Sequence, residues 1–307
     1  MIVSKCPLRV SLVGGSTDLR SYLDKYGTGS VISFPANLYT YITLKQRKDS
    51  KYRIVYSSIE EVEEGNIDKI KNDIVREALK TFPSPPCDII FTSDVPASGS
   101  GLASSTSYLI ALLYALAIQR NNLSPSQYEI CAEAHTIEKK YNPLVGYQDP
   151  YGCGLGGLKR INFVGRNPPD FRFLPAEALN KMWMYLVPTN IQRSSTKILE
   201  TLDVDKIHEM SSFVDTMESH ISSQYSITGI IRLAWEKKKS TSPNILTPEL
   251  GQQEKRLLEL ENVKALKLCG AGGGGYFLVL ARDRVPKLEM DQFRIHIDNV
   301  GVTGSVI

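Results

Sequence analysis

The sequence predicts an α+β protein made of two domains, with the boundary near residue 165. A chain of 307 residues is long enough for two ordinary domains, each with a core of its own. The first half mixes strand-like and helix-like segments, whereas residues 194–239 in the second half have a mostly helical pattern. We therefore expect one domain over residues 1–165 and a second over residues 166–307.

The spacing of apolar residues places the elements of the first domain in order. Four segments are expected to be strands: residues 8–13, 38–44, 52–56 and 88–92. Residues 66–82 carry isoleucine, valine and leucine at helical spacing. The uncharged run 108–118 suits a buried helix, because so short a run cannot span a bilayer.

The next helix is expected to run from Ser124, as its N-cap, to about Tyr141, because Pro125 would then take the first helical position. Residues 142–157 are rich in glycine and proline and are predicted to form an irregular loop. In the second domain we expect strands at 182–187, 264–269 and 276–281, a loop at 243–248 and a helix at 249–260.

Charge and cysteine content exclude several classes of protein. The net charge is only +3, which does not favour a nucleic-acid or membrane-surface partner. The five cysteines are scattered, which is typical of reduced thiols in a cytoplasmic protein. Cys131 and His135, one helical turn apart, are expected to pack rather than to bind metal. The N-terminus lacks the pattern of a secretory signal.

Three glycine-rich segments each follow a predicted strand: residues 14–18, 98–105 and 270–275. Glycine has no Cβ, so backbone amides can close on a bound anion. The middle segment also opens the 108–118 helix, and a helix N-terminus favours phosphate. For any one segment alone, a tight turn without a ligand remains an alternative.

Other phosphate-binding motifs fit the sequence poorly. It contains no Walker A string and neither the His-Arg-Asp nor the Asp-Phe-Gly motif of protein kinases. Gly99, Gly101 and Ser104 nearly match the dinucleotide-binding fingerprint, but a second helix follows where that fold needs a strand. We therefore disfavour an NAD-linked dehydrogenase.

In their order and spacing, the three segments resemble the three motifs of the GHMP kinases, which include galactokinase, homoserine kinase, mevalonate kinase and phosphomevalonate kinase. The matching strings are PLRVSL with GGSTD, DVPASGSGLASS, and KLCGAGGGG. The resemblance spans the chain and implies an N-terminal domain like domain 2 of ribosomal protein S5 and a ferredoxin-like C-terminal domain. ATP and its acceptor would then meet in the cleft between them.

One branch of this family is most similar, the D-glycero-D-manno-heptose 7-phosphate kinases. The strings that carry this likeness are GGSTD, GYQDPY at 146–151 and TNIQR at 189–193. Two positions depart from the pattern. Ala103 stands where the family usually has glycine, and Pro150 stands where this branch often has glutamine.

The resemblance also implies roles for individual residues. Asp149 would act as general base near the acceptor hydroxyl, Arg9 would pair with it and steady the transferring phosphoryl group, and Ser105 and Glu138 would hold Mg²⁺. The expected nucleotide-binding residues are Pro96, Ser98, Gly99, Ser100, Gly101, Leu102, Ala103, Ser104 and Ser105. The expected acceptor-binding residues are Gly15, Ser16, Thr17, Asp18, Gly146, Gln148, Arg193, Gly272, Gly273 and Gly274.

Some of these residues have simpler interpretations. Ser105 could be a helix cap, Glu138 a solvated charge beside two lysines, and Asp149 a turn aspartate. A phosphate already present on the acceptor would need a cation, for which Arg193 is the first candidate and Lys197 the second.

The expected activity is ATP- and Mg²⁺-dependent phosphorylation of a sugar or sugar phosphate, at the anomeric hydroxyl of heptose 7-phosphate. The alternatives are a kinase for an unphosphorylated sugar, such as fucose or galactose, and a non-catalytic member that binds nucleotide and sugar to regulate a partner. No nucleic-acid or membrane partner is expected, and a homodimer stays open.

Overall fold

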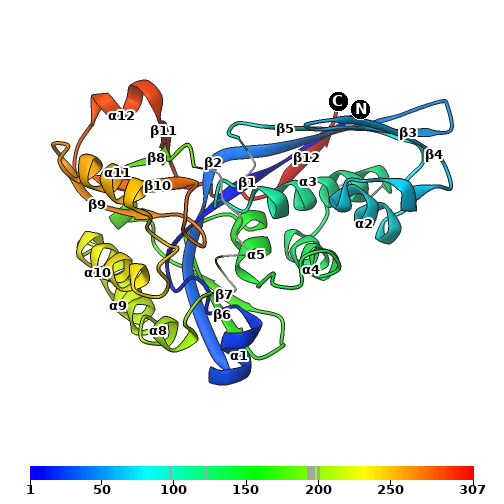
Figure 1. Ribbon diagram of the computed structural model, residues 1–307. Coiled ribbons are helices and arrows are strands. Elements are labelled where there is room, and N and C mark those ends of the chain that lie inside the picture. The colour runs from blue at the N-terminus through cyan, green and yellow to red at the C-terminus, as the bar shows by residue number, and fades with distance from the viewer. Residues whose placement is uncertain (97–98, 122–123, 192–197, 199–200) are drawn as a thin grey trace.

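Two β-sheets with helices packed on them make up the protein (Figure 1). The computed structural model describes residues 1–96, 99–121, 124–191, 198 and 201–307. The strands are β1 (Ile2–Val13), β2 (Thr28–Gln46), β3 (Lys51–Val55), β4 (Ile59–Glu63), β5 (Cys87–Ser93), β6 (Lys159–Val164), β7 (Asp170–Phe173), β8 (Trp183–Pro188), β9 (Val263–Leu268), β10 (Tyr276–Ala281), β11 (Phe293–Ile295) and β12 (Thr303–Val306). The helices are α1 (Arg20–Tyr26), η1 (Ile67–Lys69), α2 (Asp73–Thr81), α3 (Ser104–Gln119), α4 (Gln127–Glu138), α5 (Gln148–Gly154), α6 (Glu177–Asn180), α8 (Val204–His208), α9 (Ser212–Ser222), α10 (Thr228–Lys239), α11 (Pro248–Leu258) and α12 (Pro286–Asp291).

The larger sheet is organised around β2, a strand of 19 residues. Its strand order is β12-β1-β2-β5-β3-β4, and β6 and β7 extend it beside the first part of β2. Among the described strands of this sheet, β3 and β5 form the one parallel pair. This largely antiparallel order agrees with the prediction against a doubly wound dinucleotide-binding fold.

Helices α2, α3, α4 and α5 lie on one side of this sheet (Figure 1). The predicted buried helix is confirmed as α3, which packs against β1 and β2 and whose residues 109–113 have no exposed surface. The predicted strands at 8–13, 38–44, 52–56 and 88–92 are confirmed within β1, β2, β3 and β5, apart from a few end residues. Apolar spacing was therefore sufficient to locate helices and strands that pack against a single hydrophobic core.

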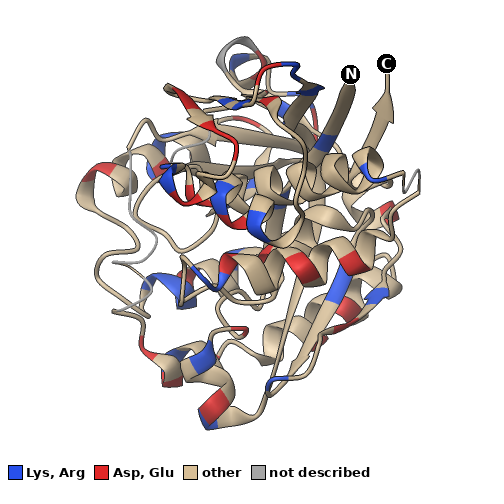
Figure 2. Cartoon of the chain, turned by 90° about the vertical axis from the view of Figure 1, so that its right-hand side faces the viewer, with Lys and Arg blue, Asp and Glu red and all other residues tan. Residues whose placement is uncertain are grey.

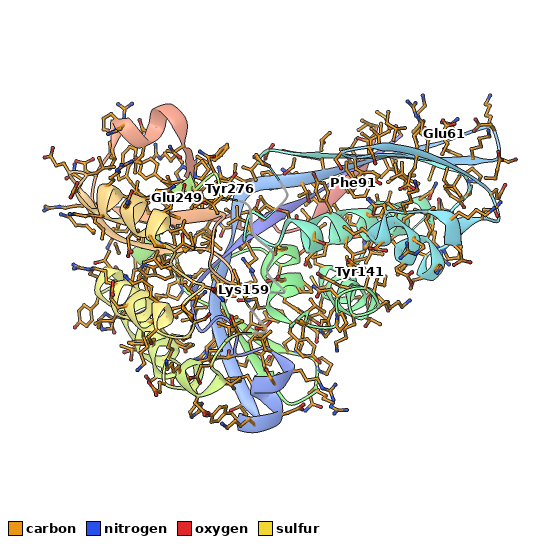
Figure 3. The ribbon with its side chains drawn as sticks, in the orientation of Figure 1. Glu61, Phe91, Tyr141, Lys159, Glu249 and Tyr276 are labelled. Atoms are coloured by element: carbon orange, nitrogen blue, oxygen red, sulfur yellow. The ribbon has the colours of Figure 1, made fainter. Side chains whose placement is uncertain are left out.

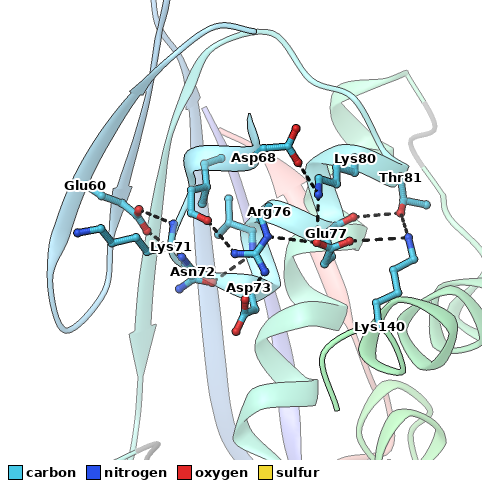
Figure 4. Close-up of polar contacts among 12 residues, drawn as sticks. Glu60, Asp68, Lys71, Asn72, Asp73, Arg76, Glu77, Lys80, Thr81 and Lys140 are labelled. Atoms are coloured by element: carbon cyan, nitrogen blue, oxygen red, sulfur yellow. Dashed lines mark hydrogen bonds and ion pairs between the residues drawn. The ribbon is translucent and has the colours of Figure 1, made fainter. Parts of the chain in front are cut away.

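The predicted helix over residues 66–82 is divided. A 3₁₀ turn, Ile67–Lys69, comes first, and α2 begins only at Asp73. Asn72 caps α2 by accepting a hydrogen bond from the amide three residues on, and Glu60 of β4 accepts from the two amides just before the helix (Figure 4). These side-chain acceptors take backbone donors and favour a new helix start at this point.

The start of α4 also differs from the prediction. The N-cap is Ser126, whose Oγ accepts a hydrogen bond from the amide of Glu129 at 3.3 Å. Ser124 and Pro125 therefore precede the helix rather than begin it. Both serines fit the capping pattern, and the structure selects the second.

The segment 142–157, predicted to be a loop, contains the buried helix α5. Its glycines allow close packing, since a Cβ at Gly152 would lie 3.3 Å from the Arg9 side chain and one at Gly154 would lie 2.2 Å from Cys131 Sγ. Glycine content here reflects a lack of space around the helix, which composition alone cannot distinguish from a turn. The helix presents Asp149 in its first turn.

We expect Gly154→Ala to lower the free energy of unfolding by about 1–3 kcal/mol, because the added methyl overpacks the contact between α5 and α4. Gly229→Ala in α10 is the matched control, since a Cβ there meets nothing within 4 Å. Alanine in that helix should instead stabilise by about 0.5–1 kcal/mol. Urea unfolding of both variants would check this, and equal behaviour of the two would contradict it.

The smaller sheet has the order β11-β8-β10-β9, with antiparallel neighbours. Numbered within this sheet, the order is 4-1-3-2, as expected for a ferredoxin-like domain. Helices α10 and α11 pack on β9, and the predicted strands at 182–187, 264–269 and 276–281 are confirmed within a residue or two at their ends.

The two ends of the chain lie side by side on the larger sheet (Figure 1). β12 pairs with β1, and the Met1 amino group donates to the Ile307 carbonyl at 3.1 Å. The last strand thus returns to a sheet formed mainly by the first half of the sequence. A division of the chain at residue 165 stays a prediction.

Surface and core give three further facts. All five cysteines are buried and unpaired. Figure 2 shows basic and acidic residues interspersed on the face that it presents. Among the described helices, none has the length and apolar content needed to cross a bilayer.

Candidate active site

A cavity of about 440 Å³ brings all three glycine-rich segments together. Its walls come from the end of β1 and the turn after it, the start of α3, the segment from α4 to α5, and the residues that follow β9. Helix α10 adds Ala234 and Lys238. Segments that are distant in the sequence therefore share one site.

Arg9 and Asp149 form an ion pair at this cavity. Arg9 Nε and Nη2 lie 2.8 and 2.7 Å from Asp149 Oδ1, and Nη1 donates to the Gly101 carbonyl at 2.7 Å. Burial opposes the charge on Arg9, but the neighbouring Asp149 carboxylate prevails and raises the pKa of the guanidinium. An arginine within an apolar strand thus has the partner that the sequence predicted for it.

Only one oxygen of Asp149 is used in this pair. Both guanidinium contacts go to Oδ1, and no described residue donates a hydrogen bond to Oδ2. The Asp149 side chain is 28% exposed, whereas Arg9 is 4% exposed. The free oxygen is therefore available to a ligand in the cavity.

The middle glycine segment wraps the start of α3. Gly99 and Gly101 have φ of +67° and +76°, and Ser100 Oγ lies 2.8 Å from Ser104 Oγ. Ala103, the N-cap, has φ 61° and ψ 39°, a left-handed conformation that suits glycine better. The departure from the family pattern at this position therefore places a residue with a Cβ in a strained backbone conformation.

Not all predicted nucleotide-binding residues line the cavity. Gly99, Ser100, Gly101, Ala103, Ser104 and Ser105 do. Leu102 is buried in the core and Pro96 is exposed, and neither lines the cavity, so their part in nucleotide binding stays a prediction. Ser98 lies outside the described residues.

Glu138 ends α4 with its carboxylate buried at the cavity wall. Oε2 accepts a hydrogen bond from Thr106 Oγ1 at 2.7 Å, and burial raises the pKa of Glu138 to about 7. Glu138 is therefore not a solvated surface charge, which was the alternative suggested by the two lysines that follow it. Lys140 extends instead toward α2, where its Nζ donates to Thr81 Oγ1 (Figure 4).

The Glu138 carboxylate and the exposed Ser105 hydroxyl line the same cavity, beside Tyr141. Burial disfavours the charged carboxylate, and a cation would offset this cost. Hard oxygen donors in small number suit Mg²⁺, which takes its other ligands from water and phosphate. Within the described part of the chain, no cluster of three His, Cys, Asp or Glu offers a richer cation site.

Asp18 is buried beside the Arg9–Asp149 pair. Its Oδ2 accepts from the Gln148 amide at 2.9 Å, and burial raises the pKa of Asp18 to about 6, with a smaller contribution from Asp149. A Cβ on Gly146 would come within 2.0 Å of that same oxygen. The absence of a side chain at Gly146 therefore lets this segment close over Asp18.

The other predicted acceptor-binding residues divide into three groups. Gly15, Ser16, Gly146 and Gln148 line the cavity, and Gln148 Oε1 is a buried acceptor without a partner among the described residues. Thr17 does not line it, because its hydroxyl donates to the carbonyls of Gly14 and Ser30. Arg193 and Lys197 lie outside the described residues.

The last glycine segment is only partly at the cavity. Gly270 and Ala271 line it, whereas Gly272, Gly273 and Gly274 do not. Added Cβ atoms on those three glycines would meet, in order, Ile245, Ile198 and Ile191, and all three have positive φ, so close packing and backbone conformation together account for glycine here. Their predicted contact with substrate has no support from this arrangement.

Comparison with known proteins agrees with this site. Residues 68–157, which include the start of α3, Glu138 and Asp149, match the family described as the GHMP kinases N terminal domain. A D-glycero-alpha-D-manno-heptose 7-phosphate kinase of Campylobacter jejuni is 29% identical over 304 residues, with 90% of this chain and 88% of that protein covered. Residues 68–157 of this chain therefore form a GHMP kinase N-terminal domain.

Solved structures of GHMP kinases share the fold. A D-glycero-D-manno-heptose 1-phosphate kinase from Bacteriodes thetaiotaomicron superposes with a TM-score of 0.74 at 18% identity, over 100% of this chain and 99% of the other. A galactokinase of Lactococcus lactis complexed with galactose gives a TM-score of 0.76 at 16% identity, over 100% of this chain and 95% of the other. These likenesses confirm the predicted α+β fold. Taken with the matched family domain and the Campylobacter relative, they indicate a phosphotransferase of the kinase class.

Two lysines that line the cavity were not predicted as site residues. Lys267 of β9 donates to the Ser11 carbonyl, and Lys238 of α10 donates to the Gly270 carbonyl. For Lys267 a signal was present, since a lysine within an apolar strand needs a partner just as Arg9 does. Lys238 belongs to a run of three lysines and carried no such signal.

Proposed function

We propose that this GHMP kinase transfers the γ-phosphoryl group of ATP to a hydroxyl of a sugar phosphate, and that the acceptor is the anomeric hydroxyl of a D-glycero-D-manno-heptose 7-phosphate. The kinase class follows from the family. The choice of acceptor rests on the Campylobacter relative and on a cavity with both acidic and basic side chains.

The observation that carries the proposal is the open oxygen of Asp149. An acceptor hydroxyl in the cavity would donate its hydrogen bond to Oδ2 and lose its proton there as the new P–O bond forms. Arg9 holds the other oxygen, so the carboxylate keeps one orientation. The guanidinium also lies where negative charge on the transferring group would be stabilised.

For the nucleotide, the backbone of Gly99–Ser105 and the first turn of α3 supply amide donors for phosphate oxygens. Glu138 and Ser105 would hold Mg²⁺. The ion supplies charge neutralisation of the phosphates when it is bound.

For the acceptor, Asp18 and Gln148 supply hydrogen-bond acceptors inside the cavity. Carboxylate and amide oxygens suit the several hydroxyls of a sugar better than the single hydroxyl of a mevalonate-like acid. This same feature would serve an unphosphorylated hexose, which is the second candidate. The galactokinase complexed with galactose has the same fold, which supports this second candidate.

The test is ADP release with Mg-ATP across a panel of acceptors: heptose 7-phosphate, free heptose, fucose, galactose, mannose, an N-acetylhexosamine and mevalonate. We expect turnover with heptose 7-phosphate and loss of turnover in Asp149→Asn. Turnover with a free sugar alone would select the second candidate. ATP binding without turnover of any acceptor would contradict the proposal and favour a regulatory member.

A further inference from the structure

Lys267 is a buried lysine whose hydrogen bonding is incomplete. It lies on β9 between apolar neighbours, is 6% exposed, and lines the cavity. Its Nζ donates to the Ser11 carbonyl at 2.5 Å, and no second acceptor exists for it among the described residues. An ammonium group has three N–H donors, so two remain without a protein acceptor there.

Lys159, a second buried lysine, shows what complete bonding looks like in this protein. It lies in the interior of the molecule (Figure 3), and its Nζ contacts three carbonyls, those of Leu155, Gly156 and Gly157, at 2.6, 3.3 and 3.1 Å. It does not line the cavity. Lys159 thus ties down the turn after α5, and all three of its donors serve the fold.

Among the described residues, Lys267 also has no counter-ion. Burial lowers the pKa of Lys267 to about 8, the Cys269 thiol acts against that shift, and the Arg9 guanidinium adds to it. The cavity carboxylates Asp18, Glu138 and Asp149 form no ion pair with it, and Asp149 is engaged by Arg9. A desolvated ammonium beside a second cation favours an anion as its missing partner.

We propose that the Lys267 ammonium binds a phosphoryl group of a ligand in the cavity through the two donors that the protein leaves unused. This rests on the proposed function, because it names the residue that would recognise phosphate within that same site. Two ligands could supply the group: the phosphate ester on the acceptor, or the terminal phosphoryl of the nucleotide. Lys267 spans from the smaller sheet to β1, so it would bind at the junction of the two sheets.

The experiment compares affinities by titration calorimetry, without turnover, in the wild type, Lys267→Met and Lys267→Arg. Five ligands are used: inorganic phosphate alone, heptose 7-phosphate paired with free heptose, and AMP-PNP paired with ADP, both with Mg²⁺. Methionine keeps the length of the side chain and removes the charge. The wild-type ammonium is buried and has a single protein acceptor, so removing its charge removes a desolvation cost. Lys267→Met should therefore fold, with a free energy of unfolding at least as large as that of the wild type.

We expect Lys267→Met to lose about 10- to 100-fold in affinity either for heptose 7-phosphate or for AMP-PNP, while its affinity for the paired ligand, heptose or ADP, stays unchanged. Lys267→Arg should recover part of this loss. A fall for heptose 7-phosphate relative to heptose assigns the acceptor phosphate, and a fall for AMP-PNP relative to ADP assigns the terminal phosphoryl. Inorganic phosphate gives a readout that does not depend on which sugar is the substrate.

Lys159→Met is the matched control. It should destabilise the fold, since three carbonyls lose their donor, yet leave the affinity ratio of each pair unchanged. Unchanged ratios in a folded Lys267→Met would overturn the proposal, as would a wild type that binds none of the phosphorylated probes. If the wild type binds inorganic phosphate and AMP-PNP but not heptose 7-phosphate, the proposed acceptor is contradicted. The affinities of Lys267→Met for phosphate and AMP-PNP then test the role of Lys267 separately.

Discussion

Asp149→Asn is expected to lower kcat by about 10²- to 10⁴-fold, with little change in ATP affinity. Asparagine keeps an oxygen that can accept from Arg9, so the local geometry should persist. Its amide cannot take up the proton of an acceptor hydroxyl at the position of Oδ2. Steady-state ADP release and titration with ATP would measure the two quantities.

Asp24→Asn is the control for this variant, because Asp24 is an exposed carboxylate on α1 that pairs with the exposed Arg20. It should keep wild-type kcat. The melting temperature of Asp24→Asn should stay near that of the wild type, whereas Asp149→Asn should lower it, because the buried Arg9 guanidinium loses its counter-ion. If a folded Asp149→Asn turned over the acceptor at the wild-type rate, Asp149 would not be the proton acceptor and its pairing with Arg9 would serve binding alone.

Asp18→Asn is expected to stabilise the protein at pH 8 while raising KM for the acceptor at least about tenfold. Burial raises the pKa of Asp18 to about 6 in the folded state, from an ordinary value of 3.8. The folded state therefore holds this proton more tightly than the unfolded chain does, and the wild type loses stability as pH rises from about 4 to about 6. Above that range the cost levels off at about 3 kcal/mol, which the neutral amide avoids.

Urea unfolding at pH 5 and pH 8 tests the sign of this effect. The stability difference between Asp18→Asn and the wild type should be larger at pH 8 than at pH 5, because Asp18 is ionised in the folded state only at the higher pH. Asp24→Asn, at an exposed site, should show no such widening. A difference that does not change with pH would mean that the folded protein holds the Asp18 carboxylate charged at no cost.

Arg9 shows why part of the site could be predicted from the sequence. A guanidinium within an apolar strand must find a counter-ion, and the family resemblance named Asp149 as that partner. The two residues are 140 positions apart, and the structure places them in direct contact. The same reasoning applied to Lys267 would have marked a second cavity cation.

Residues around α5 show where sequence reasoning failed. Glycine and proline within 142–157 are typical of a loop, but Gly152 and Gly154 belong to a helix that packs directly on Arg9 and Cys131. Glycine propensity reports backbone freedom, while these glycines were needed for space. Gly272–Gly274 differ from these, since all three have positive φ as well as close isoleucine neighbours. They do not line the cavity, and their contact with substrate stays a prediction.

The sequence by itself determined the class of protein. Its three glycine-rich segments, their order and their spacing indicated the family whose N-terminal domain matches residues 68–157. Apolar spacing located α3 and most strands, because these signals are local or depend on residue type alone. Only the tertiary structure decided which polar groups meet: Oδ2 of Asp149 is open, Glu138 and Asp18 are buried, and Lys267 has donors to spare. Burial and partner distance depend on packing between segments far apart in the chain, and no local pattern encodes them.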